Sequence, residues 1–267
     1  SLSAAEAPRS ADPRTLDEVF WTVPEDATPE LLAATWGVGR LLYELNPDLS
    51  AGEKISAGTA LRVYEVDPDE PTRSIGAPNR GRLVNGIPIP EGDAWRLRPH
   101  RRRAYGTHKT VSTLVQVFEA YGVEFPDAPK VRVGELAGRK GGRASPHRSH
   151  RTGRDVDLGY IALGEDDGDI RWQRMNAGNF DAEKNWFLIH EMIKSGNVET
   201  IFVSKKLQTL LYKEAKRQGM SDEELAGIFQ YPRGADSAKA IVKHWKGHAD
   251  HMHVRFHCEE WNQRCRG

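Results

Sequence analysis

Residues 147–159 read HRSHRTGRDVDLG, a stretch that joins two histidines to the pattern of a strand. Asp155 and Asp157 alternate with Val156 and Leu158. Successive side chains of a strand point to opposite faces, so the two carboxylates fall on one face and the two apolar side chains on the other. We therefore predict a strand here with a polar face and a face turned to the core.

Residues 247–256 read GHADHMHVRF and show the same alternation. His251 and His253 would share one face of a strand, while Met252 and Val254 would point into the core. Residues two apart on a strand lie about 7 Å apart along the backbone, so both histidines cannot easily bind one ion equally. The spacing allows one of them to bind a metal while the other faces the water beside it, but a pair of histidines at this spacing does not by itself identify a metal site.

The remaining elements follow from the spacing of apolar residues. Apolar stripes predict helices over residues 111–121, 180–194, 207–215 and 235–245, and short apolar runs predict buried strands at 131–133 and 201–203. Strands and helices are mixed without a regular βαβ repeat, so we expect the α+β class.

The chain divides into four segments. Residues 1–16 are rich in Ala, Ser, Pro and Arg and are predicted to be a disordered lead-in. The sequence pattern of residues 17–66 predicts a compact unit with the element order strand, helix, helix, strand. Residues 67–73 form an acidic, Pro-containing linker, and residues 74–267 form a second, larger domain.

The N-terminal unit resembles a LysM domain. The similarity rests on Trp21-Thr22-Val23, Gly37-Val38, Leu45-Asn46-Pro47-Asp48 and Ile55-x-x-Gly58-x-x-Leu61. The resemblance implies a βααβ fold that binds the N-acetylglucosamine of peptidoglycan or chitin. The alternative is a small packing unit without a ligand.

Composition narrows the class of protein. The formal net charge is zero, which argues against nucleic acid as the main partner. No apolar run approaches the length of a membrane span. Small residues at positions 1–5 resemble the region around a signal-peptide cleavage site, but an arbitrary start of the sequence would look the same. A periplasmic or secreted location is our expectation.

The two cysteines, Cys258 and Cys265, lie close together near the end of the sequence. In an oxidising compartment this pair would close a small disulfide loop. Two reduced thiols are the alternative, and zinc ligation is less favoured because structural thiolate sites usually show closely paired cysteines.

His150 and Asp157 are suited to a catalytic zinc site, which usually has three protein ligands and one open position. Six residues separate them, and Gly153 supplies a turn that can bring them together. Asp155 lies on the same strand face and would hold a ligand in place rather than bind the ion itself.

The two histidine motifs together resemble lysostaphin-type, D-Ala-D-Ala and hedgehog-type zinc peptidases. Three wider stretches narrow the similarity to the penicillin-insensitive murein endopeptidases: SIGxxNRGRL from residue 74, HRSHxxGRDVD from residue 147 and GHxDHxHVR from residue 247. The resemblance covers residue 74 to the end. It implies a zinc peptidase domain with a central, mainly antiparallel sheet.

The resemblance also implies roles for single residues. His150, Asp157 and His253 match the ligands of one Zn²⁺ ion, and His251 matches the catalytic histidine. His147 and His248 match further active-site histidines. Asp181 is a candidate active-site acid through the looser pattern Asp181-x-x-x-Asn185-Trp186, but an Asp that opens a helix is also a natural N-cap.

Six basic residues surround the first motif: Arg139, Lys140, Arg143, Arg148, Arg151 and Arg154. Because guanidinium groups bind carboxylates well, this location favours a site for the carboxylate-bearing peptides of the cell wall.

The sequence thus predicts a secreted zinc peptidase that cleaves D-alanyl–meso-diaminopimelyl cross-links in peptidoglycan. In this hypothesis zinc activates a water, His251 acts as base or stabilises the tetrahedral intermediate, and His248 or His147 orients the substrate or protonates the leaving amine. The alternatives are a D,D- or L,D-carboxypeptidase on stem peptides and a non-catalytic wall-binding protein with a structural zinc.

Overall fold

The computed structural model describes residues 17–23, 25–36, 39–98, 101–165, 172–234, 237 and 239–267. The predicted lead-in, residues 1–16, lies outside the described residues. None of the helices among the described residues is long and apolar enough to cross a membrane.

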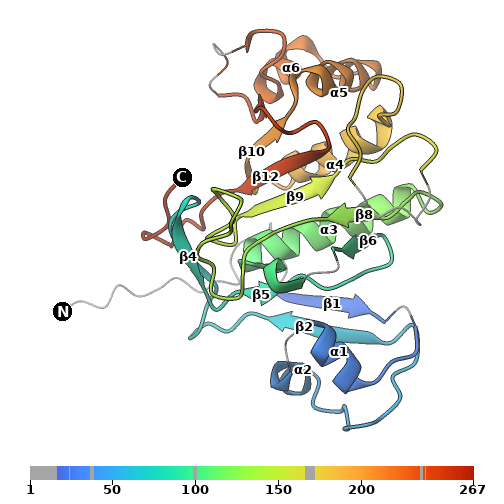
Figure 1. Ribbon diagram of the computed structural model, residues 1–267, viewed down its shortest axis with the longest axis vertical. Coiled ribbons are helices and arrows are strands. Elements are labelled where there is room, and N and C mark those ends of the chain that lie inside the picture. The colour runs from blue at the N-terminus through green and yellow to red at the C-terminus, as the bar shows by residue number, and fades with distance from the viewer. Residues whose placement is uncertain are drawn as a thin grey trace.

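The N-terminal unit has the predicted order of elements, and it forms the lower part of Figure 1. Its elements are β1 (Glu18–Thr22), α1 (Pro29–Trp36), α2 (Arg40–Leu45) and β2 (Ala60–Glu65), with β1 and β2 paired antiparallel. Asn46 follows α2, and its side-chain amide donates to the carbonyls of Leu42 and Arg62. Asn46 therefore ties the end of the helix to β2.

The N-terminal unit packs on the larger part of the chain through apolar residues. Val19 and Trp21 of β1 belong to the same buried cluster as Ile87 and Trp95. A continuous apolar core between the two parts resists their separation, because exposing it to water costs free energy.

A six-stranded sheet forms the centre of the larger part, with the strand order β11-β10-β12-β9-β8-β6. Its strands are β6 (Trp95–Leu97), β8 (Val131–Val133), β9 (Asp155–Gly159), β10 (Val198–Val203), β11 (Val242–His244) and β12 (His251–Phe256). The pairs β10–β12, β12–β9 and β9–β8 are antiparallel, whereas β10–β11 and β6–β8 are parallel. The predicted α+β class and the mainly antiparallel sheet are confirmed.

Helices complete the fold around this sheet (Figure 1). They are α3 (His108–Glu124), α4 (Ala182–Lys194), α5 (Lys205–Arg217), α6 (Asp222–Ile228) and the short 3-10 helix η2 (Arg101–Arg103). Apolar residues of α3 and α4, such as Leu114 and Ile189, are fully buried in one cluster with Leu158 and Val254 of the sheet. The apolar faces of β9 and β12 therefore meet these helices, which leaves the opposite faces for polar residues.

The prediction of a helix over residues 235–245 is wrong in the part that the structure describes. Residues 242–244 form β11, a strand parallel to β10, with Ile201 paired to Val242. Residues 235, 236 and 238 lie outside the described residues. Pairing at the sheet edge satisfies the backbone of these residues, and this tertiary contact overrides the local apolar spacing.

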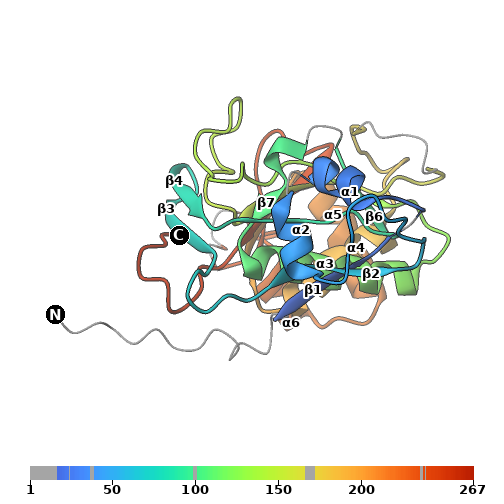
Figure 2. The same ribbon diagram turned by 90° about the horizontal axis from the view of Figure 1, so that it is seen from below.

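Short strands and the C-terminal segment frame the sheet. The strands are β3 (Arg73–Ala77), β4 (Arg80–Val84), β5 (Ile87–Pro88) and β7 (Tyr105–Gly106). Cys258 and Cys265 are joined in a disulfide. The segment after Cys258 then runs beside β3, where the Gly76 amide donates to Arg264 and the Arg266 amide donates to Gly76. Figure 2 shows β3 and β4 next to the C-terminal segment.

Candidate metal centre

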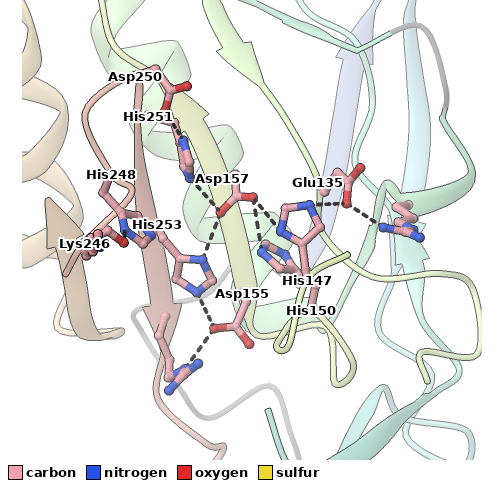
Figure 3. A network of polar contacts seen from close by, with 12 residues as sticks. Glu135, His147, His150, Asp155, Asp157, Lys246, His248, Asp250, His251 and His253 are labelled. Carbon is pink, nitrogen blue, oxygen red and sulfur yellow. Dashed lines mark hydrogen bonds and ion pairs between the residues drawn. The ribbon is translucent and has the colours of Figure 1, made fainter. Parts of the chain in front are cut away.

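The register of β9 and β12 brings the two sequence motifs together. His253 lies directly opposite Asp157, and His251 lies opposite Gly159. The polar residues of both strands therefore project from the same face of the sheet, as Figure 3 shows.

The loop before β9 adds His147 and His150 to this face. Gly153 has a φ of 75° in the left-handed region, which glycine adopts without steric cost, and it turns the chain into β9. His150 has a φ of 62°, a conformation that few non-glycine residues adopt, and its side chain is fully buried. Such backbone strain at a buried polar residue is typical of functional sites.

Asp157 is the centre of the cluster (Figure 3). Its Oδ2 lies 3.2 Å from His150 Nε2 and 3.7 Å from His147 Nδ1. Its Oδ1 lies 2.9 Å from His253 Nδ1 and 3.9 Å from His251 Nε2. Four imidazoles therefore surround one buried carboxylate.

The donor atoms in this cluster suit a metal ion. His150 is buried with neither ring nitrogen in a hydrogen bond, and Asp157 Oδ2 is also without a hydrogen-bond partner. Unsatisfied buried polar atoms are costly, and a cation between them would satisfy them. Potential ligand atoms of His147, His150 and Asp157 all lie within 4.8 Å of one another.

One group of residues in the structure whose ligand atoms lie close enough to hold an ion is His147, His150 and Asp157. It includes His147, which the sequence assigned to catalysis, and the predicted set of His150, Asp157 and His253 stays a prediction. His253 nevertheless contacts the other oxygen of Asp157. We therefore keep both histidines as candidates for the third ligand.

In two histidines of the cluster, the ring nitrogen that faces away from Asp157 contacts a carboxylate. His253 Nε2 lies 2.8 Å from Asp155 Oδ1, which also accepts a 2.8 Å hydrogen bond from Arg255 Nε. His147 Nε2 lies 3.0 Å from Glu135, which pairs with Arg103. A carboxylate on the outer nitrogen fixes the ring orientation and tautomer of a metal-binding histidine.

His251 and His248 extend the cluster away from Asp157. His251 Nδ1 lies 2.7 Å from Asp250 Oδ1, and its ring stacks on Trp172 with centroids 4.7 Å apart. Trp172 reaches this place because Gly134 lacks a side chain, since a Cβ there would lie 2.4 Å from the indole. The His248 ring lies 4.9 Å from that of His251, and its Nδ1 contacts the Lys246 carbonyl.

The pKa values of the ionisable groups in this cluster are shifted in different directions. Burial raises the pKa of Asp157, but the nearby His150 and the hydrogen-bonded His253 outweigh burial and hold that pKa well below its ordinary value. Burial lowers the pKa of His253, but Asp155 and Asp157 outweigh it and raise that pKa to about 9. Burial, with the neighbouring His251 and His253, lowers the pKa of His248 to about 4. At neutral pH His253 is thus protonated and His248 is neutral.

Asp181 lies at the N-cap of α4. Its Oδ1 accepts a hydrogen bond from the Lys184 amide, and its Oδ2 pairs with Lys184 Nζ at 2.7 Å. Among the described residues, none of its side-chain hydrogen bonds or ion pairs reaches the histidine cluster. The structure therefore gives Asp181 a capping role, and its role as an active-site acid stays a prediction.

The cluster lies in an open groove of about 670 Å³. Besides the cluster residues His147, Asp157, His248, His251 and His253, it is lined by Ala77, Pro78, Asn79, Arg148, Ser149, Phe202, Trp245, Arg255 and Gly267. A groove of this volume is large enough for a ligand the size of a short peptide segment.

Three residues of this region carry no role in the sequence prediction. Glu135 follows a short strand, and Trp172 lies far along the chain from His251, so no local pattern connects either to the cluster. Asp250 directly precedes His251 in the sequence, and this adjacency could have indicated their contact.

Histidines and carboxylates that converge in a groove are typical of metal-dependent hydrolases. Residues 74–222, more than half of the chain, match the penicillin-insensitive murein endopeptidases. The chain belongs to this family. Over 211 residues it is 24% identical to a penicillin-insensitive murein endopeptidase of Yersinia enterocolitica, a match that covers 72% of this chain and 69% of that protein.

Family membership supports the cleavage of peptidoglycan cross-links and a periplasmic or cell-wall location. Residues 17–66 lie outside the family match, so their similarity to LysM domains stays a prediction.

Proposed function

We propose that this protein is a secreted, zinc-dependent endopeptidase that hydrolyses D-alanyl–meso-diaminopimelyl cross-links in peptidoglycan. The observation that carries the proposal is the buried Asp157 carboxylate, which His150, His253 and His147 surround in the groove. Zinc fits these donors because it prefers imidazole nitrogens and carboxylate oxygens in four-coordinate sites.

In this proposal His150, Asp157 and His253 hold the metal. Bound Zn²⁺ would lower the pKa of a water to about 7 and polarise the scissile carbonyl. Asp155 would hold His253 Nε2, so that Nδ1, the nitrogen that faces Asp157, would be the one that binds the ion. His147, backed by Glu135, would support the other side of the site.

His251 is the proposed base. Asp250 and Trp172 fix its ring with Nε2 directed toward Asp157 Oδ1, 3.9 Å away. Attack of water on the carbonyl carbon forms the new C–O bond, and His251 takes the proton. Breaking the C–N bond then requires that a proton be returned to the leaving amine, and His251 or His248 would supply it.

The disulfide between Cys258 and Cys265 favours an oxidising compartment, which agrees with secretion. We further propose that the βααβ unit of residues 17–66 binds glycan strands. Tethering through this unit would raise the effective concentration of the peptidase at the wall.

Digestion of purified cross-linked muropeptide dimers, followed by mass spectrometry, tests the proposal. We expect conversion of dimers to monomers that a chelator stops and added zinc restores. A His251→Ala variant is the matched control, since it should bind zinc and leave the dimers intact. Release of terminal D-alanine from monomers alone would identify a carboxypeptidase, and intact dimers with zinc bound to the wild type would favour a wall-binding protein.

A further inference from the structure

The charged side chains of the groove are distributed unevenly. Outside the cluster around Asp157, Arg148 and Arg255 are the only charged side chains among the described residues that line the groove. Both are positive, and within the described part of the chain no acidic side chain outside the cluster lines the groove. The groove is therefore electrostatically complementary to an anionic ligand.

Arg148 differs from the other basic residues of its loop. Arg139, Lys140, Arg143, Arg151 and Arg154 do not line the groove. Arg154 is fully buried and binds Glu199 and the carbonyls of Phe256 and Arg266, so it holds the fold together and does not meet a substrate. Of the six basic residues that were predicted to form a carboxylate site, Arg148 is therefore the one that remains a candidate.

The side chain of Arg148 is exposed, and it has no hydrogen-bond or ion-pair partner among the described residues. It directly follows His147, whose Nδ1 lies 3.7 Å from Asp157. Arg255, by contrast, is held by Asp155 and lies over the Phe202 ring. Arg148 is therefore the guanidinium that is free to bind a ligand close to the cluster.

The chemistry of the proposed substrate places a carboxylate there. The scissile nitrogen of a diaminopimelyl cross-link is bonded to a carbon that also carries a carboxyl group. That carboxylate must lie within a few ångströms of the bond that is cleaved, beside the metal centre. A guanidinium binds a carboxylate through two parallel hydrogen bonds, which a neutral carboxamide cannot accept in the same way.

We infer that Arg148 is a specificity-determining residue that binds the carboxylate next to the scissile amide. This inference rests on the proposed function, because it names the part of the cross-linked peptide that the same site recognises. The ligand class is a peptide with a free α-carboxylate on the leaving-amine side.

The test compares two synthetic cross-linked peptides that differ in one group, the carboxyl next to the scissile amide, present as the free acid or as the primary carboxamide. We expect the wild type to cleave the free acid with a kcat/KM roughly 10- to 100-fold higher than the carboxamide. Arg148→Gln should reduce this preference to about 2-fold through a loss on the free acid alone. Arg148→Lys should keep part of it, because the charge remains.

Arg143→Gln is the matched control, since Arg143 is exposed on the same loop and does not line the groove. It should keep the full preference. Equal cleavage of both peptides by the wild type, or an unchanged preference in zinc-loaded Arg148→Gln, would overturn the inference and leave the proposed function intact. Cleavage of neither peptide by the zinc-loaded wild type would overturn both.

Discussion

The two faces of β9 and β12 differ in what the burial of their side chains costs. On one face Val156, Leu158 and Val254 are fully buried against helices. On the other, Asp155 and Asp157 are at most 1% exposed. Burial of the apolar face stabilises the fold, whereas burial of charge costs free energy unless each group is paired. The free energy gained by burying the apolar face therefore offsets the cost of burying the charged groups of the site on the other face.

The largest effect should come from removing the centre of the polar face. We expect Asp157→Ala to lose stoichiometric zinc and to lower kcat/KM by roughly 10³-fold or more, because water activation depends on the metal. Metal analysis and muropeptide digestion measure the two effects. A variant that keeps both zinc and activity would refute the placement of the metal at Asp157.

The apolar face should respond in stability and not in chemistry. Leu158→Ala should lower the free energy of unfolding by about 2–5 kcal/mol, because it opens a cavity in a fully buried core. Urea unfolding measures the loss. The folded fraction should keep its zinc, and a loss of zinc at low temperature would show that the two faces are not independent.

Loss of Asp155, which contacts His253, should weaken zinc binding less than loss of a proposed ligand. Asp155→Asn keeps the shape but removes the charge on Asp155 Oδ1, which contacts His253 Nε2 and Arg255 Nε. We expect a 10- to 100-fold weaker zinc affinity, as is typical for such partners. Competition with a chelating dye measures the affinity, and a change below about 2-fold would count against this role.

Asp181→Ala separates the two interpretations of that residue. Loss of the N-cap should lower the free energy of unfolding by about 1 kcal/mol and leave kcat unchanged. A large decrease of kcat in the folded variant would instead establish Asp181 as an active-site acid.

The smallest measurable effect should be the release of a proton from His253 when zinc binds. The pKa of His253 in the metal-free chain is raised to about 9, so this histidine is protonated at pH 7 and must lose its proton to bind zinc. Above that pKa it is already neutral, so the proton release attributable to His253 should fall from about one at pH 7 toward zero at pH 10. Calorimetry in buffers of different ionisation enthalpy measures it. Asp157 adds no release, because its lowered pKa keeps it ionised.

Local patterns were enough to predict most of the fold. Period-two alternation identified both strands of the site, because a strand with one buried face must alternate. Apolar spacing likewise located α3, α4 and α5. It failed at residues 242–244, where pairing with β10 replaced the expected helix.

By itself, the sequence determined which residues are able to bind a metal and which faces of their strands they share. His150, Asp157 and His253 were chosen from residue chemistry and resemblance. The register that sets His253 opposite Asp157 was decided only in the tertiary structure, as were the contacts of Glu135 and Trp172. The same holds for Arg148, which alone of its basic loop lines the groove. The physical reason is that sequence spacing fixes the direction of a side chain within its own element, whereas contacts between distant segments depend on how the whole core packs.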